Sequence, residues 1–234
     1  MRKLVRKGLY KRLRRLVRWG KMANFADNME QEYSSVLLEN AVTALSRFPG
    51  VGRKTALRFA LHLLRRPAEE AEGIARAIAD LRSGIQYCRL CHNISETELC
   101  PICSSPKRNT STTVCVVESV KDVMSIENTR RYFGLYHVLG GLISPVDGIG
   151  PDALEIRSLI ERVTAGGVEE VILATGATVE ADTTNFYIYR LLSRSAPDVK
   201  VTQLARGVSV GNELSYTDEA TLARSILGRT PFEV

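Results

Sequence analysis

The feature that most constrains this chain is a set of four cysteines in a short, turn-rich segment. The segment reads YCRLCHNISETELCPICSS, and eight residues separate its two C-x-x-C pairs. Each pair can form a knuckle that directs two thiolates at one ion, and two knuckles complete a tetrahedral site. We therefore expect one structural Zn²⁺ per chain, with sulfur filling all four positions. Its ligands are Cys88, Cys91, Cys100 and Cys103.

A redox dithiol or four buried free thiols are the alternatives to zinc, and the tandem pairs favour zinc over both. The fifth cysteine, Cys115, lies in an apolar run and is expected in the core. No h-region of a secretory signal is visible, so five cysteines indicate a reducing compartment, the cytoplasm. No run of 18 apolar residues occurs, so we expect no membrane partner.

The sequence on the two sides of the cysteines has different periodicities. After them, short apolar runs alternate with helical patterns, which predicts an α/β half with a mostly parallel sheet. The predicted strands are 113–118, 135–139, 170–175 and 200–204, and the predicted helices are 120–130, 152–165, 184–194 and 217–228. Before the cysteines, apolar stripes predict helices over 33–47, 53–64 and 68–86. The fold class is therefore multidomain, α followed by α/β.

The turn between the first two helices reads RFPGVGRKT. It is not a nucleotide-binding P-loop, because Arg53 separates Gly52 from Lys54 and the earlier glycine of that motif is missing. Free amide groups at a helix N-terminus suit a single phosphate of a polynucleotide. A plain turn between two helices is the alternative, and the pattern alone does not separate the two.

The positive charge of the chain is concentrated at its start. The whole chain carries +6, whereas residues 1–28 carry +9 and the remainder −3. Apolar residues at helical spacing in this segment predict a basic amphipathic helix, which suits anionic lipid or nucleic acid. The favoured alternative is a misassigned start, since Met22 and Met29 follow closely.

Acidic residues follow the strands of the α/β half. Glu118 ends the first strand, Asp122 lies one helical turn later, and Glu180 and Asp182 follow the third strand. Ligands of open α/β sheets bind beyond these strand ends, and clustered carboxylates there can hold Mg²⁺. We favour the simpler interpretation, in which these acids cap helix N-termini.

The chain resembles the RecR family of bacterial recombination mediators over residues 30–234. The resemblance rests on FPGVGRKTALRFALHLL, the cysteine box, VCVVESVKDVMSIENT, YHVLGGLISPVDGIGP and ARGVSVGNELSYTDEATLARSIL. The α/β half is similar to a Toprim domain. The implied organisation is a basic extension (1–28), a helix-hairpin-helix domain (29–86), a four-cysteine zinc finger (87–112), a Toprim domain (113–206) and a C-terminal segment (207–234).

The resemblance implies a DNA-repair accessory protein that is not an enzyme. It would act with RecO and RecF to load RecA onto single-stranded DNA coated with single-strand-binding protein. Family members form homodimers and homotetramers that clamp single- or double-stranded DNA, which implies a place near the bacterial nucleoid. Carried over by motif, Lys54 and Arg58 contact DNA with Arg53 as a helper, while the Gly50 and Gly52 turn offers amides to a phosphate.

The similarity to Toprim enzymes is partial. Glu118 is present, but Thr175-Gly176-Ala177 stands where those enzymes have a D-x-D, and a two-metal site needs close carboxylates. Residues 180–184 read EADTT where the family commonly has EGEAT. We therefore expect Glu118, Asp122 and Asp182 to bind partners. A Mg²⁺-dependent nuclease or primase using these acids, and an adaptor that does not bind DNA itself, are the alternatives.

Overall fold

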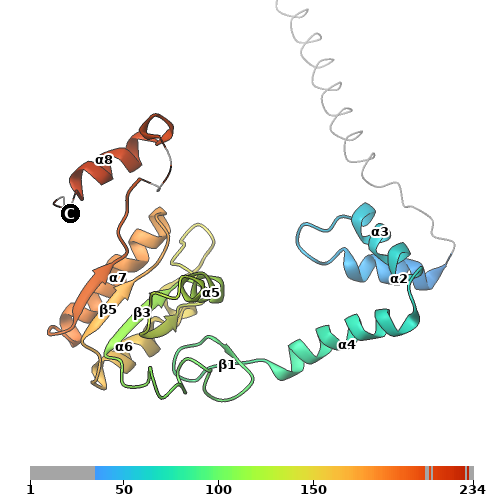
Figure 1. Cartoon of the computed structure of the whole chain (residues 1–234), viewed down its shortest axis with the longest axis horizontal. Coiled ribbons are helices and arrows are strands. Elements are labelled where there is room, and N and C mark those ends of the chain that lie inside the picture. Colours follow the sequence, from blue (N-terminus) through green and yellow to red (C-terminus); the bar gives the residue numbers. More distant parts are fainter. Residues whose placement is uncertain (1–34, 209–210, 212, 230, 232–234) are drawn as a thin grey trace, which may run out of the picture. The chain divides into compact units, whose positions relative to one another are not determined.

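The computed structural model describes residues 35–208, 211, 213–229 and 231 (Figure 1). The chain divides into two compact units, one ending at Ile78 and the other beginning at Ala79. The predicted basic amphipathic helix and the alternative start sites Met22 and Met29 lie outside the described residues. No helix in the described part of the chain is long and apolar enough to cross a membrane.

The first unit is built from helices, as predicted. α2 spans Val36–Leu45, α3 spans Arg53–Leu63, and α4 spans Ala68–Gly84 and continues into the second unit. α2 and α3 pack through a small core of Val42, Ala56 and Ala60. The two alanines allow a close approach of the helices, which fixes the turn between them.

The second unit begins with the cysteine segment, which contains two short strands. β1 (Gln86–Tyr87) and β2 (Ile94–Ser95) pair antiparallel, with Gln86 opposite Ser95. This hairpin brackets the first C-x-x-C pair and leads the chain into the second.

A four-stranded parallel sheet forms the body of the second unit, which confirms the predicted α/β half. Its strands are β3 (Thr113–Val117), β4 (Leu135–Val138), β5 (Glu170–Leu173) and β6 (Lys200–Gln203), in the order β4-β3-β5-β6. β4 and β6 are therefore the edge strands. The helices between them are α5 (Val120–Asn128), α6 (Ile156–Thr164) and α7 (Val179–Ser195).

Successive side chains of β3 point to opposite faces of the sheet, so β3 contributes to a core on each face. Val114 and Val116 pack with Leu159 of α6 and with Ile188 and Leu192 of α7. Cys115 and Val117 face the other way and pack with Val123 of α5. Cys115 is 2% exposed, which confirms its expected place in the core, and burial raises the pKa of its thiol to about 12.

Two predicted helix boundaries were wrong. α7 begins at Val179 and not near residue 184, because the Thr178 hydroxyl accepts a hydrogen bond of 3.2 Å from the Ala181 amide and caps the helix. Glu180 and Asp182 therefore lie in the first turn of α7 and not in a loop. α6 begins at Ile156, preceded by a 3-10 turn, η1, over Pro151–Ala153; η2 (Leu214–Tyr216) and α8 (Glu219–Leu227) complete the described chain.

Candidate nucleic-acid interface and metal centre

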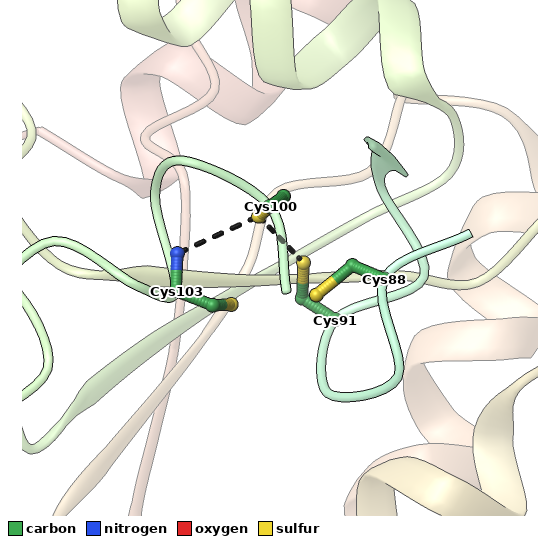
Figure 2. Close-up of side chains that lie close together, drawn as sticks. All are labelled: Cys88, Cys91, Cys100 and Cys103. Carbon is green, nitrogen blue, oxygen red and sulfur yellow. Dashed lines mark hydrogen bonds between the residues drawn. The ribbon is translucent and has the colours of Figure 1, made fainter. Parts of the chain in front are cut away.

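The four cysteines of the box converge on one point. Cys88 and Cys91 come from one loop and Cys100 and Cys103 from the next, with their sulfurs directed inward (Figure 2). All four sulfurs lie within 4.8 Å of one another, and the Cys91 and Cys100 sulfurs are 3.5 Å apart. A tetrahedral ion with Zn–S bonds of about 2.3 Å holds its sulfurs about 3.8 Å apart. The cluster therefore has the dimensions of a zinc site with four thiolate ligands.

The protonation of these thiols also fits a cation. Hydrogen bonds from Cys103 and Cys91 lower the pKa of Cys100, so one sulfur readily carries a negative charge. The hydrogen bond to Cys100 raises the pKa of both Cys91 and Cys103, and burial raises them further. Further thiolates in this buried cluster therefore need a cation to offset their charge, and a divalent ion supplies it.

The first knuckle is bound to the edge of the sheet. The Val138 amide of edge strand β4 donates a hydrogen bond of 2.8 Å to the Cys91 carbonyl. The Arg162 guanidinium of α6 donates to the Leu90 carbonyl at 3.3 Å and to the Tyr136 carbonyl at 2.7 Å. The zinc finger thus covers part of an otherwise open sheet edge, and the ion stiffens that contact.

Two histidines lie behind this knuckle. His92 adopts a left-handed backbone with φ 59°, and its ring meets that of His137 edge-on at 5.1 Å. The Ser158 hydroxyl lies 3.0 Å from His92 Nε2, and Glu155 Oε2 lies 3.5 Å from the same nitrogen. Since hydroxyl and carboxylate share one nitrogen, they do not form the relay of a hydrolase, which uses both ring nitrogens. The group joins the finger to α6.

The predicted phosphate-binding turn is present in the first unit. Gly50 has φ +79°, a conformation that favours glycine, and the Val51 amide donates to the Phe48 carbonyl at 3.1 Å to close the turn. Gly52 is the N-cap of α3 and has no side chain to cap it, and the first turn of α3 contains no acidic residue. This helix end therefore keeps its affinity for an anion.

Lys54 and Arg58 lie one helical turn apart on α3, and both are exposed. Together with His62 and Arg65 they line a shallow groove of about 370 Å³ whose floor includes Leu57 and Leu61. Arg53, the predicted helper, is exposed at the first position of α3. The sequence pattern did not single out His62 and Arg65, although His62 lies four positions after Arg58 on the same face of α3. Arg65 follows the end of α3.

The three acids of the sheet edge do not form one site. Ser119 donates to Asp122 Oδ2 twice, from its amide at 2.8 Å and from its hydroxyl at 2.9 Å, so Asp122 caps α5. Asp182 forms ion pairs with Arg206 at 2.6 Å and with Arg224 of α8 at 3.4 Å. Within the described chain, the group of three or more side chains placed to hold a metal ion is the cysteine cluster.

These features together define a class: a multidomain protein with a helix-hairpin-helix, a four-cysteine zinc finger and a Toprim-type parallel sheet. Family models agree segment by segment. They match the RecR helix-hairpin-helix at residues 38–82, the RecR zinc finger domain with four cysteines at 85–105, the Toprim domain at 112–205 and the RecR C-terminal region at 207–230.

Whole-chain similarity extends this result. The chain is 56% identical to recombination protein RecR of Bacteroides thetaiotaomicron over 204 residues, covering 87% of this chain and 98% of that protein. It is 57% identical to that of Phocaeicola vulgatus, with the same coverage. Against that of Flavobacterium johnsoniae it is 52% identical, covering 86% and 97%. The chain belongs to the recombination protein RecR family.

Proposed function

We propose that this chain is a DNA-binding recombination mediator in bacterial DNA repair, acting in the cytoplasm at the nucleoid. In this proposal it works with RecO and RecF to help load RecA onto single-stranded DNA. It acts as a homo-oligomeric clamp on single- or double-stranded DNA and does not itself catalyse a reaction. Membership of the recombination protein RecR family supports the general role.

The observation that carries the proposal is the turn before α3. Its uncapped helix end attracts one phosphate, while Lys54 and Arg58 on the exposed face of α3 take neighbouring phosphates. These are contacts to the backbone of DNA, so binding should not depend on base sequence. Zinc has a structural role in this scheme, since four thiolates leave no open position on the ion.

The test compares a Lys54→Ala/Arg58→Ala variant with the full-length wild type on DNA of several base compositions. We expect the dissociation constant to rise by roughly tenfold or more on every sequence, since two phosphate contacts are removed. The control is Lys121→Ser/Arg194→Ser, which removes two exposed positive charges from α5 and α7. Equal affinity of the hairpin variant and the control would contradict the proposal.

The clamp needs contacts between copies, and the first unit offers an apolar surface for them. A groove of about 840 Å³ runs between α2, the end of α3 and the start of α4. Two of its leucines are largely exposed, Leu37 at 81% and Leu64 at 72%. Apolar surface of this extent commonly marks an association site. Light scattering should show a smaller assembly for Leu37→Glu/Leu64→Glu, and an unchanged mass would exclude this groove as the contact.

The proposal also assigns a role to Glu118, Asp122 and Asp182: they bind partners and do not hold a catalytic metal ion. The engagement of Asp122 in a helix cap and of Asp182 in two ion pairs argues against a metal site formed by these carboxylates. Glu118 is half-buried just after the end of β3. Mg²⁺-dependent cleavage or synthesis of DNA that disappears in Glu118→Gln would establish the rival enzymatic function.

A further inference from the structure

A basic loop leads into the amino end of edge strand β4. It follows α5 and reads Thr129-Arg130-Arg131-Tyr132-Phe133-Gly134. Arg130 and Arg131 are exposed, and Phe133 is exposed to 69%. The intervening Tyr132 points inward, where its hydroxyl lies 2.8 Å from the Leu135 carbonyl and 3.2 Å from the Thr113 carbonyl. This half-buried tyrosine thus holds the loop, while its neighbours face solvent.

A second segment brings another cation to this loop. Arg108 donates to Glu127 through both terminal nitrogens, at 2.8 and 3.0 Å, and to the Tyr132 carbonyl at 3.4 Å. Lys107, which precedes Arg108 in the sequence, is exposed. We call Lys107, Arg130, Arg131 and Phe133 the amino-end patch.

The patch keeps its positive charge. Among the described residues, none of its three cations forms an ion pair, whereas Glu127, the acid that contacts this region, is paired with Arg108. Glu169 and Glu170 lie at the amino end of β5, which β3 separates from β4 in the sheet order. Thr112 contacts Glu169, and Lys200 pairs with Glu170. The patch is therefore a local cationic surface on a body that is acidic overall.

The backbone of the loop is fixed. Arg130 has φ +54°, a conformation that costs a side chain free energy and that glycine adopts freely. At Gly134 an added Cβ would collide with the Tyr132 hydroxyl and would lie 2.9 Å from the Thr113 carbonyl. The loop therefore presents its cations and its phenyl ring from a rigid support, which reduces the entropy lost on binding a ligand.

We infer that the amino-end patch is a second nucleic-acid contact, specific for single strands. Lys107, Arg130 and Arg131 hold consecutive phosphates, and the Phe133 ring stacks on an unpaired base. A duplex does not offer a base face to an exposed ring, so the phenyl group selects the single strand. An acidic protein segment would bind the cations alone and would not need the Phe133 ring. The inference rests on the proposed DNA-binding function and extends it to a site separate from α3.

The charge test uses Arg130→Gly/Arg131→Ser in the full-length protein, with a fluorescent thymidine oligonucleotide as the ligand. We expect the slope of log affinity against log salt to become shallower by about 1.4, since each phosphate contact to a single strand contributes about 0.7. Glycine accepts the backbone at position 130, so the melting temperature should not fall. Lys121→Ser/Arg194→Ser is again the charge-matched control, and its slope should stay at the wild-type value.

The ring test uses Phe133→Leu, which keeps an apolar side chain but removes the aromatic face. We expect affinity for the thymidine oligonucleotide to fall by roughly fivefold or more, the scale of one stacked base. Affinity for an abasic oligonucleotide of the same length should not change. Equal losses on both ligands, or no loss on either, would overturn the stacking contact.

The hairpin variant Lys54→Ala/Arg58→Ala separates this inference from the proposed function. If only the hairpin variant loses affinity, the amino-end patch is not a DNA contact and the inference fails while the hairpin proposal stands. If only the patch variants lose affinity, the inference stands and the hairpin assignment fails. If the patch variants bind DNA normally but lose affinity for polyglutamate, the surface binds acidic protein and the inference is wrong.

Discussion

The Val138 amide donates a hydrogen bond of 2.8 Å to the Cys91 carbonyl, so the backbone of a zinc knuckle is bound to the edge strand of the parallel sheet. A metal ligand is thereby placed next to the strand whose other side pairs with β3. Loss of the ion should therefore destabilise the edge of the sheet as well as the finger.

Chelation of zinc, or Cys88→Ser, should lower the free energy of unfolding by more than about 3 kcal/mol, since structural zinc contributes on the order of 10 kcal/mol to isolated fingers. Hydrogen exchange locates the effect. The Val138 amide should exchange much faster, while the Ala174 amide, bonded to Val116 inside the sheet, should change little. Unaltered melting after verified removal of the ion would contradict a structural role.

The ion pair between Arg108 and Glu127 should stabilise the fold measurably. Their side chains are 18% and 29% exposed, and the Tyr136 hydroxyl donates a further hydrogen bond of 2.7 Å to Glu127. Arg108→Ala should cost about 1–3 kcal/mol in chemical denaturation, because it leaves a half-buried carboxylate without its partner. Arg89→Ala is the matched control, since the Arg89–Glu98 pair is 67% and 70% exposed and should contribute less than about 1 kcal/mol.

The same pair predicts a dependence on acid. Burial acts to raise the pKa of Glu127, but the hydrogen bonds from Arg108 and Tyr136 outweigh it and lower that pKa overall. The unfolded carboxyl has a pKa of about 4.3, so the stabilisation is complete above this pH and is lost as the pH falls through the lower folded value. Wild type and Glu127→Gln should therefore converge in stability in strong acid and diverge at neutral pH.

His137 should remain neutral in the folded protein where an ordinary histidine is charged. Burial lowers its pKa to about 3, while Nε2 lies 2.7 Å from the Glu155 carbonyl, so the proton belongs on Nε2. The unfolded chain binds this proton near a pH of about 6.5, so stability falls as the pH drops below that value, by up to about 1.4 kcal/mol per pH unit. Nitrogen NMR shifts should show no titration of His137 between about pH 6.5 and 5, and a titration in that window would contradict the assignment.

Asp182 should tether the C-terminal segment to α7. It pairs with Arg206 and Arg224, whose positions in the sequence lie on either side of the turn η2. Asp182→Asn should speed hydrogen exchange in α8 while changing overall stability by no more than about 1 kcal/mol, because these groups are partly exposed. Asp198→Asn, an exposed acid at the end of the segment before β6, serves as the control. Equal exchange in both variants would rule out the tether.

The sequence was informative where one short segment determines the structure. The spacing of the cysteines predicted the cluster, and the two glycines predicted the turn before α3. The apolar runs predicted the four strands of the parallel sheet, but not the short strands β1 and β2. The expected capping of a helix N-terminus is confirmed for Asp122, which forms a capping box with Ser119.

Contacts between distant segments were not predictable in this way. Asp182 meets two arginines that are 24 and 42 positions away, and Cys91 meets Val138 across the finger. Such pairs depend on how the elements pack, and no local pattern encodes them. The early start of α7 was missed for a different, local reason, since the Thr178 cap outweighed the weak apolar pattern of the first turn.

The most direct test of the central claim is the salt dependence of DNA binding by the hairpin. For Lys54→Ala/Arg58→Ala on single-stranded DNA, the slope of log affinity against log salt should be shallower than the wild-type slope by about 1.4, the value for two lost phosphate contacts. A slope equal to that of the wild type would show that α3 does not contact the phosphate backbone.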